Sequence, residues 1–430
     1  PMLRLDTHFA AELEGFYVPW TGAAVPAPRV LQLNRELARE LGLDPDALDS
    51  EEGAALLAGM EPPEGARPLA QAYAGHQFGG FVPQLGDGRA LLLGEIVDPE
   101  GRHRDLHLKG SGPTPFARGG DGKAVLGPVL REYLMGEAMH ALGIPTTRGL
   151  AAVTTGERIV RRTGPKPGAI LARVAASHLR VGTFEFVAAR GRTEELARLV
   201  DYALRRHDPE LADSETPALA LFRAVLRRQA ALVARWMGVG FIHGVMNTDN
   251  TAISGETIDY GPCAFMDAYD PATVFSSIDH HGRYAYGQQP GIMQWNLARF
   301  AEALLPLLER GTEEDPVTVA TAEVQGFGLA YRKAWLEVMR GKLGLAGTRE
   351  EGRGAADEGG GDDETGADAE SDDEALIVAL HEAMEGQEVD FTRLFRRLAD
   401  VLRGDAGPVR ALFDDPTVVD PWLERWSGRM

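Results

Sequence analysis

The sequence predicts an α+β protein with two lobes, a β-rich lobe followed by an α-helical lobe. Short apolar runs separated by Gly and Asp turns predict strands between about residues 70 and 175. After about residue 190 the apolar positions recur with helical periodicity. We therefore divide the 430 residues into an N-terminal extension (1–65), a β-rich N-lobe (66–180) and a helical C-lobe (181–430).

The strands of the N-lobe follow from local patterns. We expect them at 90–97, 105–109, 158–162 and 169–174. In the second of these, Leu106 and Leu108 should point to one face, and Asp105, His107 and Lys109 to the other, because side chains alternate along a strand.

Two long helices have recognisable ends. The first should run from Pro128 to about Leu142, with Gly143 as its stop. The second should begin at Thr216 and Pro217, a cap followed by a first-turn proline. Its apolar face would consist of Phe222, Val225, Leu226, Gln229, Leu232, Val233 and Trp236.

The composition excludes several classes of protein. Hydrophobic residues make up 44% of the chain, and no run approaches the ~18 apolar residues of a membrane span. The first residues lack the order of a secretory signal, and the single cysteine, Cys263, cannot form an internal disulfide, so we expect it to be a small buried residue. The net charge of −20 argues against a nucleic-acid partner. We expect a cytoplasmic protein without membrane or nucleic-acid partners.

Much of the negative charge lies in one stretch of the C-lobe. Residues 350–374 contain twelve acidic residues and one arginine, together with many Gly and Ala and no aromatic residue. Such a composition cannot bury enough apolar surface to fold. We expect a solvated, disordered insertion at about 349–374, followed by a helix that begins near Ala375.

The sharpest chemical motif is the segment from His243 to Asn250, followed nine residues later by Asp259. Residues 251–253 and 257–258 flank a Ser-Gly-Glu turn, and a short hairpin there would bring Asn250 and Asp259 together. An amide oxygen and a carboxylate suit a hard divalent cation, Mg²⁺ or Mn²⁺, that completes its shell with nucleotide phosphates. This is the metal-binding arrangement of kinase-like phosphotransferases.

One position departs from the kinase pattern. Small-molecule kinases of that superfamily have His-Gly-Asp and then, after four residues, the Asn, with the Asp as catalytic base. Here Val245 stands at the place of that Asp and cannot accept a proton, while a carboxylate, Asp249, lies directly before Asn250. The protein therefore has either no base for phosphoryl transfer or a differently placed one.

Upstream residues complete a candidate nucleotide site. Lys109 ends a strand and Glu132 lies in the following helix, in the order in which kinases place their nucleotide lysine and its partner. The turn formed by Gly86, Asp87, Gly88 and Arg89 could bring backbone amides and a guanidinium to phosphate oxygens, although an Asp-Gly turn is commonplace.

Two further parts of the N-lobe are ambiguous from the sequence alone. Asp121 and Gly122 lie in a Gly-rich loop, 110–127, that fits either a flexible lid or an ordinary connection. Arg173 and Arg180 flank the passage between the lobes, where they would bind phosphate or form surface salt bridges.

Taken together, these motifs resemble the selenoprotein O family of protein adenylyltransferases. The resemblance covers about residues 5–340, and its stretches are 73–80, 84–89, 108–116, 131–134, 173–180, 243–250, 258–262 and 265–271. It implies a kinase-like, bilobal fold that binds ATP in reverse orientation, so that the α-phosphate faces the incoming hydroxyl. A flipped nucleotide needs no base at Val245.

The resemblance also implies roles for individual residues. Asp249 would be the general base, and Asn250 and Asp259 the ligands of Mg²⁺ or Mn²⁺. The residues holding ATP would be Gly86, Gly88, Arg89, Lys109, Glu132, Asp121, Gly122, Arg173, Arg180 and Asp259. The implied reaction moves AMP from ATP, or in some members UMP from UTP, to Ser, Thr or Tyr hydroxyls of proteins and releases pyrophosphate.

Two alternatives stay open at this point. One is a conventional kinase that transfers the γ-phosphate, and the other is an inactive, nucleotide-binding pseudokinase, for which Val245 is the only support. The family resemblance further implies a C-terminal cysteine beyond Met430, so we expect no bond between such a cysteine and Cys263 within this sequence.

Overall fold

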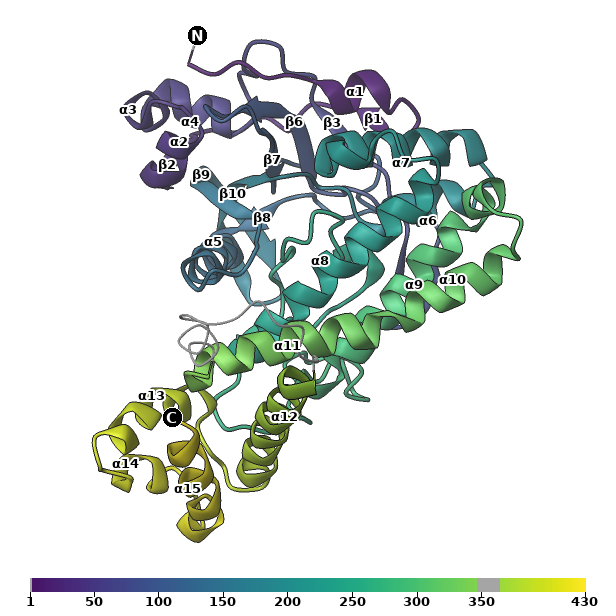
Figure 1. The fold of residues 1–430 in the computed structure, drawn as a ribbon. Coiled ribbons are helices and arrows are strands. Elements are labelled where there is room, and N and C mark those ends of the chain that lie inside the picture. Colours follow the sequence, from purple (N-terminus) through teal and green to yellow (C-terminus); the bar gives the residue numbers. More distant parts are fainter. Residues whose placement is uncertain (1, 346–363) are drawn as a thin grey trace. The chain divides into compact units, whose positions relative to one another are not determined.

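The computed structural model describes residues 2–345 and 364–430 and divides into two compact units. Unit 1 comprises residues 1–232, 245–261 and 294–325, and unit 2 comprises 233–244, 262–293 and 326–430. The structure is a mixed α/β protein, with a sheet in unit 1 and helices in both units (Figure 1).

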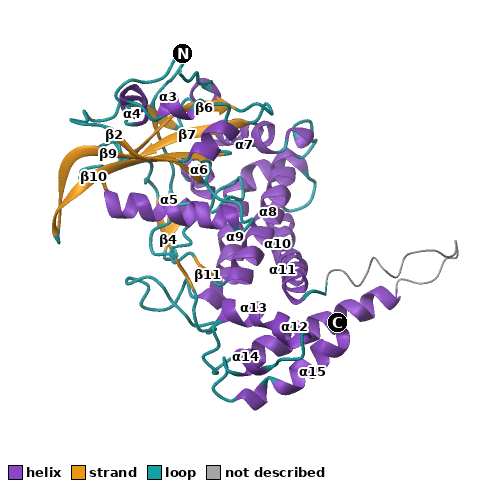
Figure 2. Cartoon of the chain, turned by 90° about the vertical axis from the view of Figure 1, so that its left-hand side faces the viewer, coloured by secondary structure: helices purple, strands orange, loops and turns teal. Residues whose placement is uncertain are grey.

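Unit 1 is built on one antiparallel sheet, drawn in orange in Figure 2. Its order is β1 (Tyr17–Pro19), β3 (Leu69–Gln71), β6 (Ala90–Val97), β7 (His103–Lys109), β10 (Gly164–Ala175), β9 (Arg148–Arg161) and β2 (Arg29–Leu33), with β8 (Ala124–Val125) against β10. β4 (Gly75–Gln77) and β5 (Gly80–Val82) form a separate two-stranded ladder.

Unit 1 also contains helices. They are α1 (His8–Glu12), α2 (Arg35–Glu40), α3 (Pro45–Leu48), α4 (Glu51–Leu57), α5 (Leu126–Ala141), α6 (Val181–Ala188), α7 (Thr193–His207), α10 (Pro316–Gln325) and the larger parts of α8 (Pro217–Val239) and α9 (Gln289–Leu308). α5 packs on β9 and β10, and α4 packs beside β2 (Figure 1).

Both predicted helices are confirmed. α5 ends just before Gly143, whose φ of +74° is the left-handed conformation expected of a helix stop. α8 begins at Pro217, and all seven residues predicted for its apolar face are buried. No described helix combines the length and the apolar character that crossing a bilayer requires.

The predicted strands are present, but β9 differs in where it begins. In β7, Leu106 and Leu108 lie in the core on one face, as predicted, and Asp105 and His107 on the other face are buried as well. β9 begins at Arg148, ten residues before the predicted start. The sequence pattern missed this first part of the strand because residues 148–153 are all buried. A strand covered on both faces reads as a continuous run of small and apolar residues, without the alternation on which the prediction relied.

The predicted hairpin at residues 251–258 is wrong. Ala252 bridges to Arg180 instead, and Thr257 bridges to Thr146. The amide of Ile253 donates to Leu179, and that of Thr147 to Thr257. The two halves of this stretch therefore pair with different segments, one near Arg180 and the other near Thr146, and these pairings position Asp259.

Unit 2 is mainly helical. Its elements are β11 (Phe241–Ile242), β12 (Ala264–Phe265), α11 (Phe327–Leu343), α12 (Glu364–Met384), α13 (Phe391–Leu402), α14 (Gly407–Arg410) and α15 (Asp420–Arg429), with the remaining turns of α8 and α9. β11 and β12 pair antiparallel, and Cys263, next to β12, is buried as expected.

The predicted acidic insertion needs a correction at its C-terminal side. Residues 349–363 lie outside the described residues, but 364–374 form the start of α12, which was expected only near Ala375. Asp373 is buried and pairs with Arg340 at 2.9 Å and Arg429 at 3.3 Å. Composition alone missed these distant arginines, which compensate the charge of the acidic helix.

We predict that Asp373→Ala destabilises the protein while Asp372→Ala, one residue earlier, does not. Loss of Asp373 would remove the closer of the two carboxylates that Arg340 contacts, the other being Glu370 at 3.8 Å, and breaking a buried ion pair in this way typically costs about 3 kcal/mol. Asp372 is exposed, so its loss should change the free energy of unfolding by less than about 0.5 kcal/mol. Urea unfolding of both variants tests this, and equal stabilities would show that the start of α12 contributes nothing.

Candidate functional site

Three cationic side chains from separate segments converge on the carboxylate of Asp259. Lys109 Nζ lies 3.2 Å and Arg173 Nη1 2.8 Å from Oδ1, and Arg180 Nη1 lies 2.6 Å from Oδ2. Burial by itself would raise the pKa of Asp259, but Arg180, Lys109 and Arg173 outweigh it and hold that pKa well below the usual range. The carboxylate is therefore ionised at any ordinary pH.

The backbone of Asp259 is itself unusual. Its φ is +62°, a left-handed conformation that few residues other than glycine adopt and that clusters at functional sites. Arg180 reaches past the carboxylate and also donates to the backbone carbonyl of Asp249, at 2.9 Å. One guanidinium thus connects the segments that carry the two aspartates.

A second carboxylate, Glu132, faces the same cations from α5. Its Oε2 lies 3.2 Å from Lys109 Nζ and its Oε1 lies 3.0 Å from Arg173 Nη1. Burial opposes ionisation of Glu132, but Lys109 and Arg173 together lower its pKa below the usual value. The order of a strand lysine and a helix glutamate thus corresponds to a direct contact in the structure.

Asp249 has the opposite electrostatic character. Burial raises the pKa of its carboxyl to about 6, even though Arg180 and a hydrogen bond of 3.3 Å from Gln77 to Oδ2 favour the charged form. Within the described protein, its Oδ1 is buried and has no hydrogen-bond partner. A side chain that is buried, underpaired and able to titrate near neutrality is equipped to take up a proton.

Close packing of β4 holds Asp249 in place. A Cβ atom at Gly75 would lie 2.9 Å from the Cβ of Asp249, nearer than such atoms approach in proteins. The hydroxyl of Thr248 accepts a hydrogen bond of 2.6 Å from the amide of His76. The ladder of β4 and β5 therefore closes directly over the short 3₁₀ turn Thr248–Asn250 that carries the base candidate.

Asn250 and Asp259 carry oxygen donors of the types that a hard divalent cation binds. The side-chain amide of Asn250 donates from Nδ2 to the carbonyl of Val245 at 3.0 Å, which leaves its amide oxygen uncommitted by that bond. Amide and carboxylate oxygens are the ligands that Mg²⁺ and Mn²⁺ prefer.

The glycine turn before β6 is shaped by close packing. Gly86 has a φ of +105°, and a Cβ there would lie 2.7 Å from the ring of Phe116. A Cβ at Gly88 would lie 2.9 Å from the carbonyl oxygen of Phe116. Arg89, the next residue, is exposed on this turn.

The structure does not join Asp121 to the charged cluster around Asp259. Asp121 is exposed, forms an ion pair of 2.7 Å with Arg161 of β9 and accepts a hydrogen bond from the amide of Lys123. Gly122 follows with a φ of +66°, and its carbonyl accepts a bond of 2.9 Å from Gly112. These contacts describe an ordered connection on the sheet surface.

A buried polar layer behind the cluster was missed by sequence reasoning. Arg173 Nε donates to His178 Nε2 at 3.2 Å, so this nitrogen must be an acceptor, and Nδ1 carries the proton toward Asp105 Oδ2 at 2.9 Å. Burial holds the pKa of His178 well below its usual range, which agrees with a neutral ring. His178 therefore fixes the orientation of Arg173.

The second arginine is supported in a similar way. The His107 ring stacks on His178 at 4.3 Å, and His107 Nε2 lies 3.1 Å from Asp87 Oδ2. The other oxygen of Asp87 lies 3.8 Å from Arg180. The signal in the sequence was the alternation that places Asp105, His107 and Lys109 on one face of a strand, from which we assigned a role to Lys109 alone.

Comparisons with known proteins agree on one family. A family model described as protein adenylyltransferase SelO matches residues 2–416. A relative from Cereibacter sphaeroides is 60% identical over 427 residues, which cover 99% of this chain and 84% of the relative. Relatives from Methylorubrum populi and Pseudarthrobacter chlorophenolicus are each 56% identical, covering 100% and 99% of this chain and 83% of each relative. All three relatives are named protein nucleotidyltransferase YdiU.

We predict opposite effects on stability for Asp249→Asn and Asp259→Asn. The folded-state pKa of Asp249, about 6, lies above the ~3.9 of an unfolded aspartate, so its ionisation destabilises the fold as pH rises, by at most about 3 kcal/mol at pH 7. Asp249→Asn should therefore stabilise the protein at pH 7 and lose this gain toward pH 4.

Asp259 has a lowered pKa, so its charge stabilises the folded protein at all pH values above the unfolded pKa. Asp259→Asn should lower the free energy of unfolding at pH 7. Thermal unfolding of both variants at pH 7 and pH 4.5 tests the pair. Destabilisation of similar size by both substitutions at pH 7 would contradict the assignment of opposite environments.

Proposed function

Because the chain belongs to the SelO family of protein adenylyltransferases and is a nucleotidyltransferase, we propose that it transfers AMP from ATP to Ser, Thr or Tyr hydroxyls of proteins and releases pyrophosphate. The observation that carries the proposal is the set of three cations around one carboxylate, from β7, β10 and the start of α6. Such a set is suited to polyanionic phosphates.

Lys109, Arg173 and Arg180 contact the carboxylates of Glu132 and Asp259. The carboxylates of Asp87 and Asp249 also lie close to Arg180. A triphosphate bound with a divalent cation would have its charge compensated by these cationic groups, and its oxygens would share the guanidinium donors that now contact Asp259. Arg173 and Arg180 would thereby stabilise the charge that develops as the α-phosphate is attacked.

The metal ion of the reaction would be held by Asn250 and Asp259. When bound, Mg²⁺ or Mn²⁺ would neutralise charge on the phosphate oxygens. Asp259 stays ionised through its cationic neighbours, so it is always ready to act as a ligand. The residues Gly86, Gly88 and Arg89 would approach the phosphates through backbone amides and an exposed guanidinium, and Asp121 and Gly122 would border the nucleotide from the loop 110–127.

Asp249 would act as the general base. A carboxyl whose pKa is about 6 is ionised at pH 7 and still basic enough to accept a proton from a hydroxyl in the transition state. Its unpartnered Oδ1 is the atom that we assign to this proton. Val245, at the place of a kinase base, cannot take this role.

We further propose that the fold is kinase-like and bilobal. The support is the order of the elements along the chain: a strand that ends in Lys109, then a helix that carries Glu132, and then a helical region that contains the 248–250 turn. On this view residues 66–180 form the N-lobe, 181–430 the C-lobe, and 1–65 an extension whose strand β2 joins the sheet.

Labelled nucleotides test the reaction. With α-labelled ATP and Mn²⁺ we expect label on protein and release of pyrophosphate, and with γ-labelled ATP no label on protein. Intact mass should show an added AMP, and UTP run in parallel would reveal an added UMP. Label from the γ position alone would make the protein a conventional kinase.

A pair of variants separates the base from the metal ligand. Asp259→Ala should abolish transfer and also weaken metal-dependent ATP binding, because the ion that would neutralise the phosphate charge loses a ligand. Asp249→Ala should slow transfer by a general-base factor of ~10² to 10⁴ while ATP binding largely persists. Calorimetric titration with ATP and metal, alongside the transfer rate, measures both.

Asp201→Ala is a suitable control, because Asp201 is exposed on α7 and pairs only with Arg205 one turn away in the described contacts. It should leave both quantities unchanged. If Asp249→Ala lost ATP affinity as severely as Asp259→Ala, Asp249 would be a metal or structural ligand and another group would have to serve as base.

A further inference from the structure

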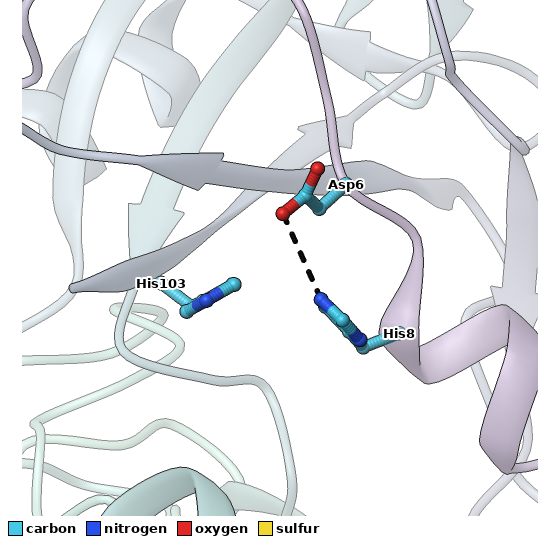
Figure 3. A group of neighbouring side chains, drawn as sticks. All are labelled: Asp6, His8 and His103. Carbon is cyan, nitrogen blue, oxygen red and sulfur yellow. Dashed lines mark ion pairs between the residues drawn. The ribbon is translucent and has the colours of Figure 1, made fainter. Parts of the chain in front are cut away.

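A second group of potential metal ligands lies elsewhere in unit 1. Among the described residues, one set of His, Cys, Asp and Glu side chains offers three donor atoms that all lie within 4.8 Å of one another: Asp6, His8 and His103. Figure 3 shows the three side chains turned toward a common space, with Asp6 and His8 on the N-terminal segment and His103 on the sheet. We propose that this group binds a divalent transition-metal ion of the zinc type.

The backbone that carries these ligands is fixed. Asp6 forms two backbone hydrogen bonds with Glu95 of β6, of 2.9 and 2.7 Å. The amides of His8 and Phe9 each donate at 3.1 Å to the carboxylate of Glu95, which binds the start of α1. His103 is the first residue of β7 and pairs with Val97 of β6. Three ligands on ordered backbone need little further ordering to bind an ion.

One pair of donor atoms already has nearly the spacing that an ion requires, and all three lie within 4.8 Å of one another. His8 Nε2 and Asp6 Oδ2 are 3.6 Å apart, whereas ligands at 2.0–2.1 Å from a tetrahedral ion are separated by roughly 3.4 Å. The rings of His8 and His103 lie 5.1 Å apart at 76°, so they do not stack on each other. Small side-chain rotations would complete the convergence.

The side chains have few competing partners. Within the described chain, Nδ1 of His103 is buried without a hydrogen-bond partner. The ion pair of His8 with Asp6 involves side chains that are 53% and 41% exposed, and exposed pairs of this kind contribute little by themselves. An ion would give all three groups a shared partner and leave a coordination position open to solvent.

The ligand types select the ion. Two imidazole nitrogens and one carboxylate suit Zn²⁺ and its transition-metal neighbours, whereas Mg²⁺ and Ca²⁺ prefer oxygen ligands. The site is also separate from the nucleotide site. His103 and Lys109 are the two ends of β7, and six residues of strand span roughly 20 Å.

Titration of the full, chelator-treated protein with Zn²⁺ alone tests the inference, with calorimetry and metal analysis as readouts. We expect one Zn²⁺ per chain and a higher unfolding midpoint in its presence. His8→Ala and His103→Ala should each weaken binding by at least the roughly 10- to 100-fold seen when a ligand loses its supporting partner. His8 is exposed, so its variant should fold even if His103→Ala does not.

Two controls make the result specific. His140→Ala removes an exposed histidine on α5 and should bind Zn²⁺ as the original protein does. Asp259→Ala alters the nucleotide site and should also retain the Zn²⁺ site. The inference is wrong if the protein binds no Zn²⁺, if His8→Ala binds it unchanged, or if binding is lost with Asp259→Ala and kept in both histidine variants.

Discussion

The arrangement of the candidate site depends on a single carboxylate, Asp259. Lys109, Arg173 and Arg180 come from different segments, and like charges at such short range would repel if nothing lay between them. Asp259 contacts all three, and Glu132 contacts two of them. The carboxylate of Asp259 thus allows three cationic side chains to lie close together in the interior of the protein.

Two buried histidines, His107 and His178, hold the arginines of this cluster in place. His178 can accept a bond from Arg173 only while it is neutral, and burial keeps it so. His107 contacts Asp87, and Asp87 in turn lies beside Arg180. The positive residues are therefore held in fixed orientations, and in the proposed reaction this preorganisation would lower the cost of stabilising charge in a transition state.

The sequence could predict those parts of the fold and site that rest on local patterns or on quoted motifs. The strand of Lys109, the helix of Glu132 and the boundaries of α5 follow from alternation and stop signals, and the contact between Lys109 and Glu132 follows from their order. Residues 148–153 of β9 were missed because both of their faces are covered. Pairing of residues 251–258 with the segments near Thr146 and Arg180 was missed because no local pattern encodes a distant partner. Asp373 was assigned to a disordered segment for the same reason, since its partners lie on other helices.

Gly75 has a consequence for how this protein tolerates change. It has no side chain, yet the chain passes so close to Asp249 there that even one methyl group would push against the base candidate. Any residue with a side chain at position 75 would therefore have to displace the carboxylate of Asp249 or the backbone of β4. Which residues the chain can accept at this position is thus decided by a side chain from a distant part of the sequence.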